Sequence, residues 1–211
     1  GGRHLAVGMI VANGLDQQAG FGVAGDDDRT VDAAFEEFLL GIHDQGAPDF
    51  GGPGAVALDE NQLSEAWADL GAVFAVSAGS DRLIFSLRSL SYPDLLAQSV
   101  ALAARQIGEP AWPDAVWQQE RERISASIRE SDTRPASVAG KAFRAAIYGA
   151  HPYGLETTPA TLARITTADM RQFYARFIEP CRAKVSLVGD VTRAQADALV
   201  KALLARLPQR D

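Results

Sequence analysis

Cysteine and histidine are both scarce in this sequence, and their scarcity limits the chemistry that it can carry. Cys181 is the only cysteine among 211 residues, so no intramolecular disulfide can form. The three histidines, His4, His43 and His151, lie far apart in the sequence. Because a zinc site needs about three protein ligands, these histidines do not by themselves indicate one.

Basic charge and long apolar runs are also missing. The chain has 20 Lys and Arg against 27 Asp and Glu, a formal net charge of −7. Nucleic acids and anionic membranes attract basic surfaces, so this balance argues against both as partners. No apolar run reaches the roughly 18 residues that span a bilayer, and we expect no membrane insertion. No signal peptide pattern opens the chain, and Gly1-Gly2-Arg3-His4 resembles an internal start. The compartment stays open between bacterial periplasm and cytoplasm.

The first quarter of the chain has the weakest pattern. An apolar run predicts a strand over residues 4–12, and Asn13-Gly14 predicts a hairpin turn, with residues 20–24 as the return strand. A helix is predicted over 31–40. Four glycines and two prolines indicate a loop over Gln45–Gly54, whose role the sequence leaves open.

From residue 57 onward the patterns are clearer. Hairpins and helices are mixed rather than strictly alternating, which indicates an α+β fold with one largely antiparallel mixed sheet and helices packed on it. We expect a single domain over residues 1–211. The predicted strands cover 73–78, 82–90 and 183–188, and the predicted helices cover 59–70, 93–107, 114–130, 135–148, 166–177 and 192–207.

The tetrapeptide His151-Pro152-Tyr153-Gly154 has the residues of a catalytic site, but each of them also has a structural explanation. His151 could act as a base. Pro152 disfavours helix at His151 and fixes an extended corner. Gly154 can leave the turn at positive φ, and Tyr153 supplies a packing ring. We interpret the tetrapeptide as a structural turn.

The other reactive side chains carry weaker signals. His43 follows a predicted helix end, where the dipole favours a cation. Cys181 has a basic neighbour, Arg182, but no histidine base beside it in sequence. The serines 77, 80, 125 and 127 lack a G-x-S-x-G context. The charged face of the long helix is predicted to be solvated; alternatively it lines a cleft. This face consists of Glu120, Arg121, Arg123, Arg129 and Glu130.

Several segments, in order, resemble peptidase family M16, the insulinase, pitrilysin and mitochondrial processing peptidase group. LGAVFAVSAGSDRLIFSLRSL (70–90) is similar to the family's strand pair after its second helix. The segments that follow also keep the family's order. They are a long helix that ends in a turn and a proline, the tetrapeptide HPYG, the strand VSLVGDV (185–191) and a helix that ends in Leu-Pro. The match covers about residues 57–208, with 1–56 weakly matched. The resemblance implies an M16 metallopeptidase-like half of a two-half protein, most like an N-terminal half.

The same resemblance implies where a zinc site would lie. Active members carry H-x-x-E-H on the first helix and a glutamate ligand on the long helix. This chain has no H-x-x-E-H, and AAFEEFLLG takes its place, so the two histidine positions become Ala34 and Phe38 and the base position Glu37. The third ligand position becomes Ala126, followed by Ser127. Because alanine and phenylalanine cannot bind zinc, the resemblance implies a non-catalytic (inactive) member without the zinc cofactor.

The implied function is a scaffold or substrate-chamber half that supports peptide proteolysis by a partner, without activity of its own. The implied partners are the C-terminal half of the same protein, a catalytic M16 subunit or a second copy in a homodimer, and a peptide substrate. Two alternatives stay open. One is an active zinc metalloendopeptidase whose site lies outside this sequence. The other is a pure assembly subunit like the respiratory-complex core proteins.

Overall fold

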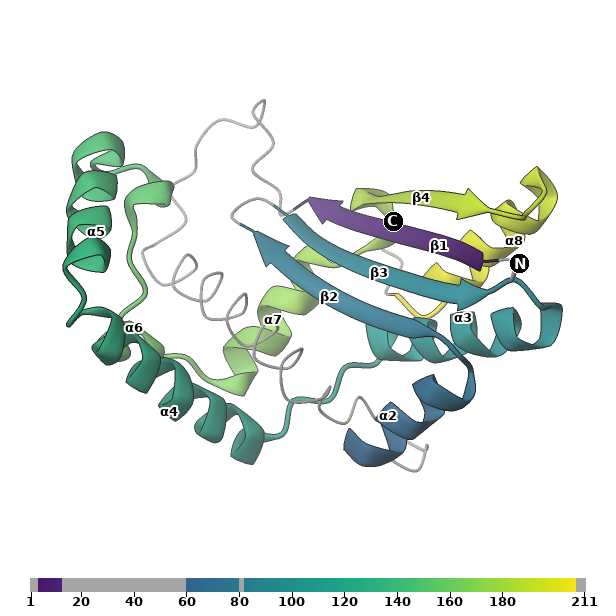
Figure 1. Ribbon diagram of the computed structural model, residues 1–211, viewed down its shortest axis with the longest axis horizontal. Coiled ribbons are helices and arrows are strands. Elements are labelled where there is room, and N and C mark those ends of the chain that lie inside the picture. The colour runs from purple at the N-terminus through teal and green to yellow at the C-terminus, as the bar shows by residue number, and fades with distance from the viewer. Residues whose placement is uncertain (1–3, 13–59, 80–81, 208–211) are drawn as a thin grey trace. The chain divides into compact units, whose positions relative to one another are not determined.

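The computed structural model describes residues 4–12, 60–79 and 82–207 (Figure 1). The predicted turn at Asn13-Gly14, the helix over 31–40 and the loop Gln45–Gly54 lie outside the described residues. The elements in chain order are β1 His4–Ala12, α2 Glu60–Asp69, β2 Val73–Gly79, β3 Arg82–Leu90, α3 Pro93–Gly108, α4 Asp114–Ser131, α5 Pro135–Tyr148, η1 Pro152–Gly154, α6 Pro159–Leu162, α7 Thr167–Phe177, η2 Pro180–Arg182, β4 Ala183–Gly189 and α8 Arg193–Leu204.

The described residues fall into two compact units. The first holds residues 4–12, 60–79, 82–112 and 174–207, and the second holds residues 113–173. The predicted single domain over 1–211 stays a prediction. Within the described ranges, every helix is too short or too polar to cross a membrane.

The first unit is built on a four-stranded sheet in the order β2-β3-β1-β4, in which all the paired strands are antiparallel. β1 lies between β3 and β4, with Val7 opposite Leu87 on one side and Leu187 on the other. The predicted α+β fold with a largely antiparallel sheet is thereby confirmed.

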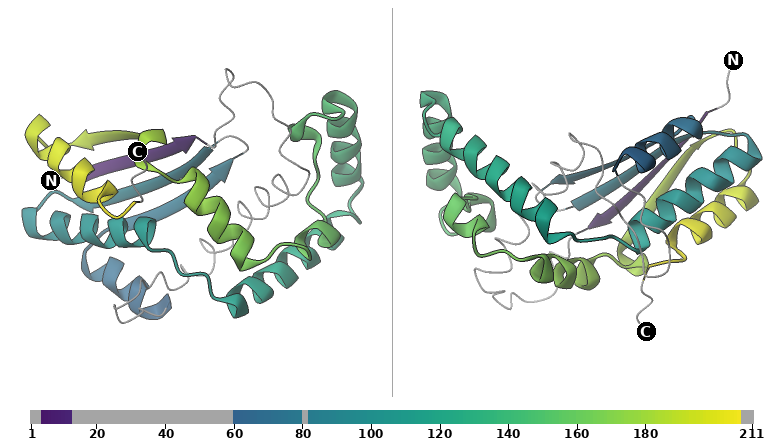
Figure 2. Two further views of the ribbon diagram at one scale, coloured as in Figure 1. Left: turned by 180° about the vertical axis from the view of Figure 1, so that it is seen from behind. Right: turned by 90° about the horizontal axis from the view of Figure 1, so that it is seen from below.

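One face of this sheet forms the core of the first unit. Because side chains alternate across a strand, every second residue of β1 and β3 points to the same face. Figure 2 shows α2, α3 and α8 on that side of the sheet. Ser89 and Ser99 are polar members of the core, and their hydroxyls hydrogen bond at 3.1 Å. The buried apolar side chains on this face of the sheet are Leu5, Val7, Met9, Leu83, Phe85 and Leu87.

Tyr174 fixes the C-terminal part of α7 to α3. Its hydroxyl donates a 2.6 Å hydrogen bond to the carbonyl of Ile107, and its ring meets Trp112 edge-on at 5.7 Å. Burial raises the pKa of Tyr174 far above its ordinary value, so the phenol keeps the proton that it donates.

The C-terminal end of α3 meets the chain after α8 at Gly108. A Cβ atom at Gly108 would lie 2.3 Å from the Cβ of Arg206 and 2.8 Å from its carbonyl oxygen. Arg206 also forms an ion pair with Glu109. Only glycine therefore allows this close approach of the two segments.

The second unit is held by α4 and the segment from α6 to α7. Trp117 on α4 is buried, and its Nε1 donates to the carbonyl of Ile165 at 2.9 Å. Asp114, at the start of α4, accepts a hydrogen bond from the hydroxyl of Thr167. Thr166 and Asp169 form a capping box at the start of α7: Asp169 accepts from the backbone N–H of Thr166 at 2.8 Å and donates its own N–H to the hydroxyl of Thr166 at 3.2 Å.

In contrast, α5 has no buried residue, although it is confirmed as a helix with the predicted bounds. Phe143 and Ile147 are 67% and 58% exposed, and Val138 is 51% exposed. Phe143 and Ile147 are four residues apart and share one side of the helix, whereas Val138 lies nine residues before Ile147, on the opposite side and one turn from Lys141. α5 therefore carries an open apolar face formed by Phe143 and Ile147.

We expect Gly108→Ala and Gly140→Ala to change stability in opposite directions. At Gly108 the added methyl group meets Arg206, which should lower the free energy of unfolding by about 1–3 kcal/mol. At Gly140, inside α5, the methyl group meets nothing within 4 Å, and the gain in helix propensity should raise stability by up to about 1 kcal/mol. Thermal melts followed by circular dichroism compare the two variants; equal shifts would contradict the described contact between Gly108 and Arg206.

Candidate functional site

The candidate zinc positions are only partly within the described chain. Ala34, Glu37 and Phe38 lie outside the described residues. Ala126 and Ser127 lie on α4, and both are exposed. The described ranges contain no group of three or more His, Cys, Asp or Glu side chains placed to hold a metal ion.

The orientation of α4 explains why Ala126 is exposed. The helix starts after Pro113, whose extended backbone precedes Asp114 in the first turn. Its buried face carries Trp117, Glu120, Ile124 and Ser125. Ala126 follows Trp117 by nine residues, or about 2.5 turns, so it lies on the opposite side of the helix. A methyl group there has no donor atom for a metal, so the residue present does not fit the zinc ligand of the active pattern.

The charged face of α4 differs in one residue from the solvated face that the sequence predicts. Glu120 is 4% exposed rather than solvated. Its carboxylate accepts a 2.9 Å hydrogen bond from Nε of Arg123, one turn further along the helix. This pairing compensates for the loss of hydration, because a buried carboxylate without a partner is costly. Arg129 and Glu130 are exposed as predicted, and Arg121 is half-buried.

His151 closes a turn between α5 and η1. Its Nδ1 accepts from the backbone N–H of Tyr153 at 3.2 Å, and its ring lies 4.7 Å from the ring of Tyr153, nearly perpendicular to it. The ring of Tyr148 packs edge-on against Tyr153 at 5.6 Å. One ring nitrogen of His151 is thus used as a helix cap, which favours the structural interpretation of this tetrapeptide.

The predicted positive φ at Gly154 is wrong. The left-handed residue is Gly149, at φ 53°, which ends α5. A Cβ at Gly154 would lie 2.9 Å from the carbonyl oxygen of Gly149 and 3.1 Å from Cβ of Tyr148. Gly154 is therefore required for space and not for its backbone angle.

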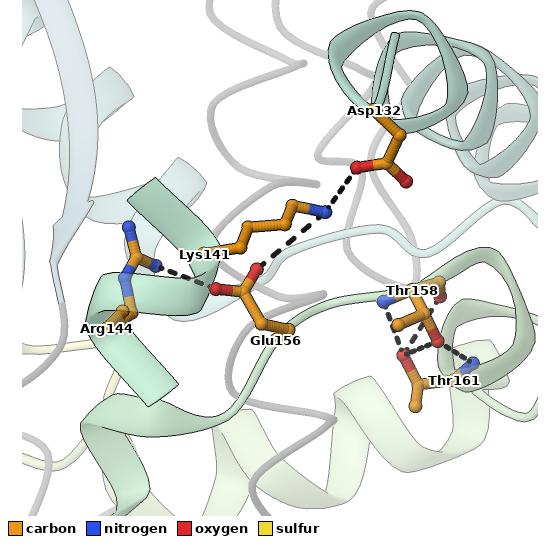
Figure 3. A network of polar contacts seen from close by, with 6 residues as sticks. All are labelled: Asp132, Lys141, Arg144, Glu156, Thr158 and Thr161. Atoms are coloured by element: carbon orange, nitrogen blue, oxygen red, sulfur yellow. Dashed lines mark hydrogen bonds and ion pairs between the residues drawn. The ribbon is translucent and has the colours of Figure 1, made fainter. Parts of the chain in front are cut away.

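Beside this turn, a charged cluster joins the end of α4, the middle of α5 and the segment after η1 (Figure 3). Nζ of Lys141 lies 2.7 Å from Asp132 and 3.9 Å from Glu156, and Nη1 of Arg144 lies 3.7 Å from Glu156. The hydrogen bond to Asp132 raises the pKa of Lys141, so the amine is charged at neutral pH. Because these groups are partly exposed, each pair contributes at most about 1 kcal/mol. The cluster positions backbone segments and has no reactive group.

Thr158 and Thr161, next to this cluster in Figure 3, form the capping box of α6. Thr158 accepts from the backbone N–H of Thr161 at 3.1 Å, and Thr161 accepts from the backbone N–H of Thr158 at 2.9 Å. The sequence analysis does not predict α6, because a helix of four residues has no apolar period. The sequence feature that marks the start of α6 is the pair Thr158 and Thr161 on either side of Pro159.

Cys181 is exposed in the short turn η2. Its neighbour Arg182 forms an ion pair with Glu179 at 2.6 Å. No described histidine lies near it in the sequence, and the serines 125 and 127 lie on α4 without a base beside them in the sequence.

No sequence motif singles out the basic side chains on the face of the sheet that the described helices leave uncovered. Arg82, Arg88 and Lys184 are exposed, and the strand register places them on the face opposite the core. The signal that could have found them is the complete lack of Asp and Glu in the four described strands.

Comparison with known proteins confirms the predicted resemblance. A family model described as the Peptidase M16 inactive domain matches residues 164–211. The probable zinc protease PqqL of Escherichia coli (strain K12) is 42% identical over 57 residues, which are 27% of this chain and 6% of that protein. The family-model match lies within the region in which the sequence patterns are clearest.

Solved structures share the fold over nearly the whole chain. The peptidase M16 inactive domain from Pseudomonas fluorescens matches 99% of this chain and 46% of its own, with a TM-score of 0.77 and 25% identity. The periplasmic protease PqqL from Escherichia coli matches 99% of this chain and 22% of its own, with a TM-score of 0.70 and 19% identity. Pitrilysin matches all of this chain and 21% of its own, with a TM-score of 0.67 and 16% identity. The chain thus spans about half the length of the first of these and about a fifth of the other two.

We expect His151→Ala to destabilise the second unit by about 1 kcal/mol, because the cap on the N–H of Tyr153 is lost. His151→Asn keeps a capping acceptor and should retain most of the stability. Chemical denaturation measures both variants. Equal loss in the two variants would show that the cap is not what His151 contributes.

Proposed function

From the fold of an M16 peptidase half, we propose that this chain is a non-catalytic half that serves as a scaffold. It pairs with another half or with an active subunit and forms part of the wall of a peptide-binding chamber. Proteolysis is then carried out by the partner, and this chain supports it by holding substrate or partner in place. The C-terminal half of the same protein, a catalytic M16 subunit and a second copy are the proposed partners, and a peptide is the proposed substrate.

The observation that supports this proposal best is the residue type on α4. Ala126 and Ser127 occupy the positions where the family resemblance places a metal-binding carboxylate, and both are exposed. Zinc hydrolysis needs a metal with an open position for water and a carboxylate base. With Ala34, Phe38 and Ala126 in the ligand positions, Glu37 has no metal-activated water to deprotonate. The match to a domain described as inactive supports the same conclusion.

Two other functions would account for the same fold. An active zinc metalloendopeptidase with its site elsewhere in a longer protein is compatible with the names of the relatives, PqqL among them. A pure assembly subunit, without any link to proteolysis, is compatible with the lack of metal-binding residues at the zinc ligand positions. The two experiments below separate these functions from the scaffold.

Restoring the ligands tests the placement of the zinc motif. We expect the purified chain to hold no stoichiometric zinc, and the triple variant Ala34→His, Phe38→His and Ala126→Glu to hold about one zinc ion per chain. A matched control carries the two histidines with Ser127→Glu in place of Ala126→Glu. This shift turns the carboxylate by about 100° around α4, away from the ligand position.

Inductively coupled plasma mass spectrometry after dialysis measures the metal. Stoichiometric zinc in the unchanged chain would contradict the non-catalytic interpretation. Zinc in the control but not in the triple variant would show that the alignment of α4 is displaced by one residue.

Mixing with an active partner tests the scaffold role. We expect the full protein to co-elute with a catalytic M16 subunit and to raise its rate of peptide cleavage. As a control, a partner whose base glutamate in H-x-x-E-H is changed to glutamine should co-elute without cleaving. Co-elution with no change in the cleavage rate would favour the assembly function, and loss of both would contradict the scaffold.

A further inference from the structure

The four described strands contain no acidic residue, although the chain has 27 of them. Their charged side chains are all basic: Arg82 and Arg88 on β3 and Lys184 on β4. In a chain with a net charge of −7, this is a local reversal of sign. The sheet therefore carries a positive charge of its own.

The strand register places all three cations on the uncovered face. Leu83, Phe85 and Leu87 of β3 point into the core, so the residues that alternate with them point outward. On β4, Lys184 lies opposite Ile10, which in turn lies opposite Ile84 of β3. Arg82, Arg88 and Lys184 thus share one face, the face opposite α3.

A row of residues with small or no side chains crosses the sheet between these cations. One row straight across the sheet consists of Ala75, Ser86, Gly8 and Ser186, as the pairings show. A Cβ added at Gly8 would meet no atom of the described residues within 4 Å, so no described side chain covers this point of the row. Arg88 lies on one side of the row, and Lys184 lies on the other.

The spacing of the cations suits a chain segment rather than a small ion. Arg82 and Arg88 are six residues apart on one strand, about 20 Å, and Lys184 lies two strands from β3, about 10 Å. None of the three makes an ion pair with a described acidic side chain, and all are exposed. Their charges are thus free to pair with carboxylates from outside the described chain.

We propose that this uncovered sheet face, which we call the basic sheet face, docks an acidic peptide segment in extended form. Carboxylates of the peptide pair with Arg82, Arg88 and Lys184, while its backbone lies over Ile84 and Ser86, which alternate with the two arginines on β3. About six extended residues span the distance from Arg82 to Arg88. The proposal rests on the proposed function, in which this half lines a peptide chamber, and it names the substrate class as peptides with clustered Asp or Glu.

Nucleic acid is the less suitable polyanion for this face. Nucleic-acid binding sites usually combine a larger basic surface with stacking aromatics, and the outward positions of the described strands have no aromatic side chain. The net charge of −7 also repels a long polyanion, whereas a short peptide senses mainly the local cations.

Fluorescence anisotropy with labelled dodecapeptides tests the proposal on the full chain. The probes alternate glycine with glutamate, glutamine or lysine. We expect binding of the glutamate peptide at low salt, weaker binding at about 0.5 M salt, and little binding of the other two. Arg88→Glu with Lys184→Glu should weaken the binding by about tenfold or more.

Matched variants separate the basic sheet face from net charge. Lys184→Glu and Lys201→Glu change the charge equally, but Lys201 is an exposed residue of α8, which packs in the helix layer. We expect only Lys184→Glu to weaken binding, and Lys184→Arg to restore it. Equal losses in both, equal binding of the glutamine peptide, or no binding at all would overturn the proposal.

Sedimentation tests a second copy as the alternative occupant. A dimer that Lys184→Glu converts to a monomer would assign the face to self-association and overturn the peptide proposal. The peptide assay needs no protease partner. A chain that binds the glutamate peptide but fails to stimulate a catalytic subunit would therefore refute the scaffold function and leave the acidic-peptide site in place.

Discussion

The backbone hydrogen bonding of β1 is the constraint on which the first unit depends. This strand is bonded to β3 on one side and to β4 on the other, so its partners lie about 80 and 180 residues away in the sequence. Only when all three strands are in place can α3 and α8 cover a continuous apolar face. Because such distant pairings close long loops, they form late and cooperatively. The register that they fix also decides which side chains face the core and which face outward.

Local signals were enough for most elements but not for their partners. Local sequence patterns predicted α3, α5, α7 and both strands of the β2–β3 hairpin. The same signals suggested a hairpin partner for β1 directly after Asn13-Gly14. The described sheet instead gives β1 the distant strands β3 and β4, and no local pattern encodes that choice. The prediction of a positive φ at Gly154 was wrong for a related reason. A side chain at this position would collide with the carbonyl of Gly149, and only the folded turn brings the two residues together.

In the candidate site, too, some features follow from the sequence and others depend on the folded structure. Residue types alone exclude a metal ligand at Ala126, and this conclusion needs no coordinates. The exposure of Ala126 and the burial of Glu120 depend on which face of α4 meets Ile165, which Trp117 determines through its hydrogen bond. A mostly polar helix gives little periodic signal for that face. The basic sheet face was missed because its cations are far apart in sequence and meet only through the register of β1.

The open apolar face of α5 has a consequence for how the free chain behaves in solution. With a net charge of −7, copies of the chain repel one another at low ionic strength. Added salt screens that repulsion and leaves the attraction between exposed Phe143 and Ile147 side chains in place. The solubility of the free chain should therefore fall as ionic strength rises, and covering α5 would remove this dependence.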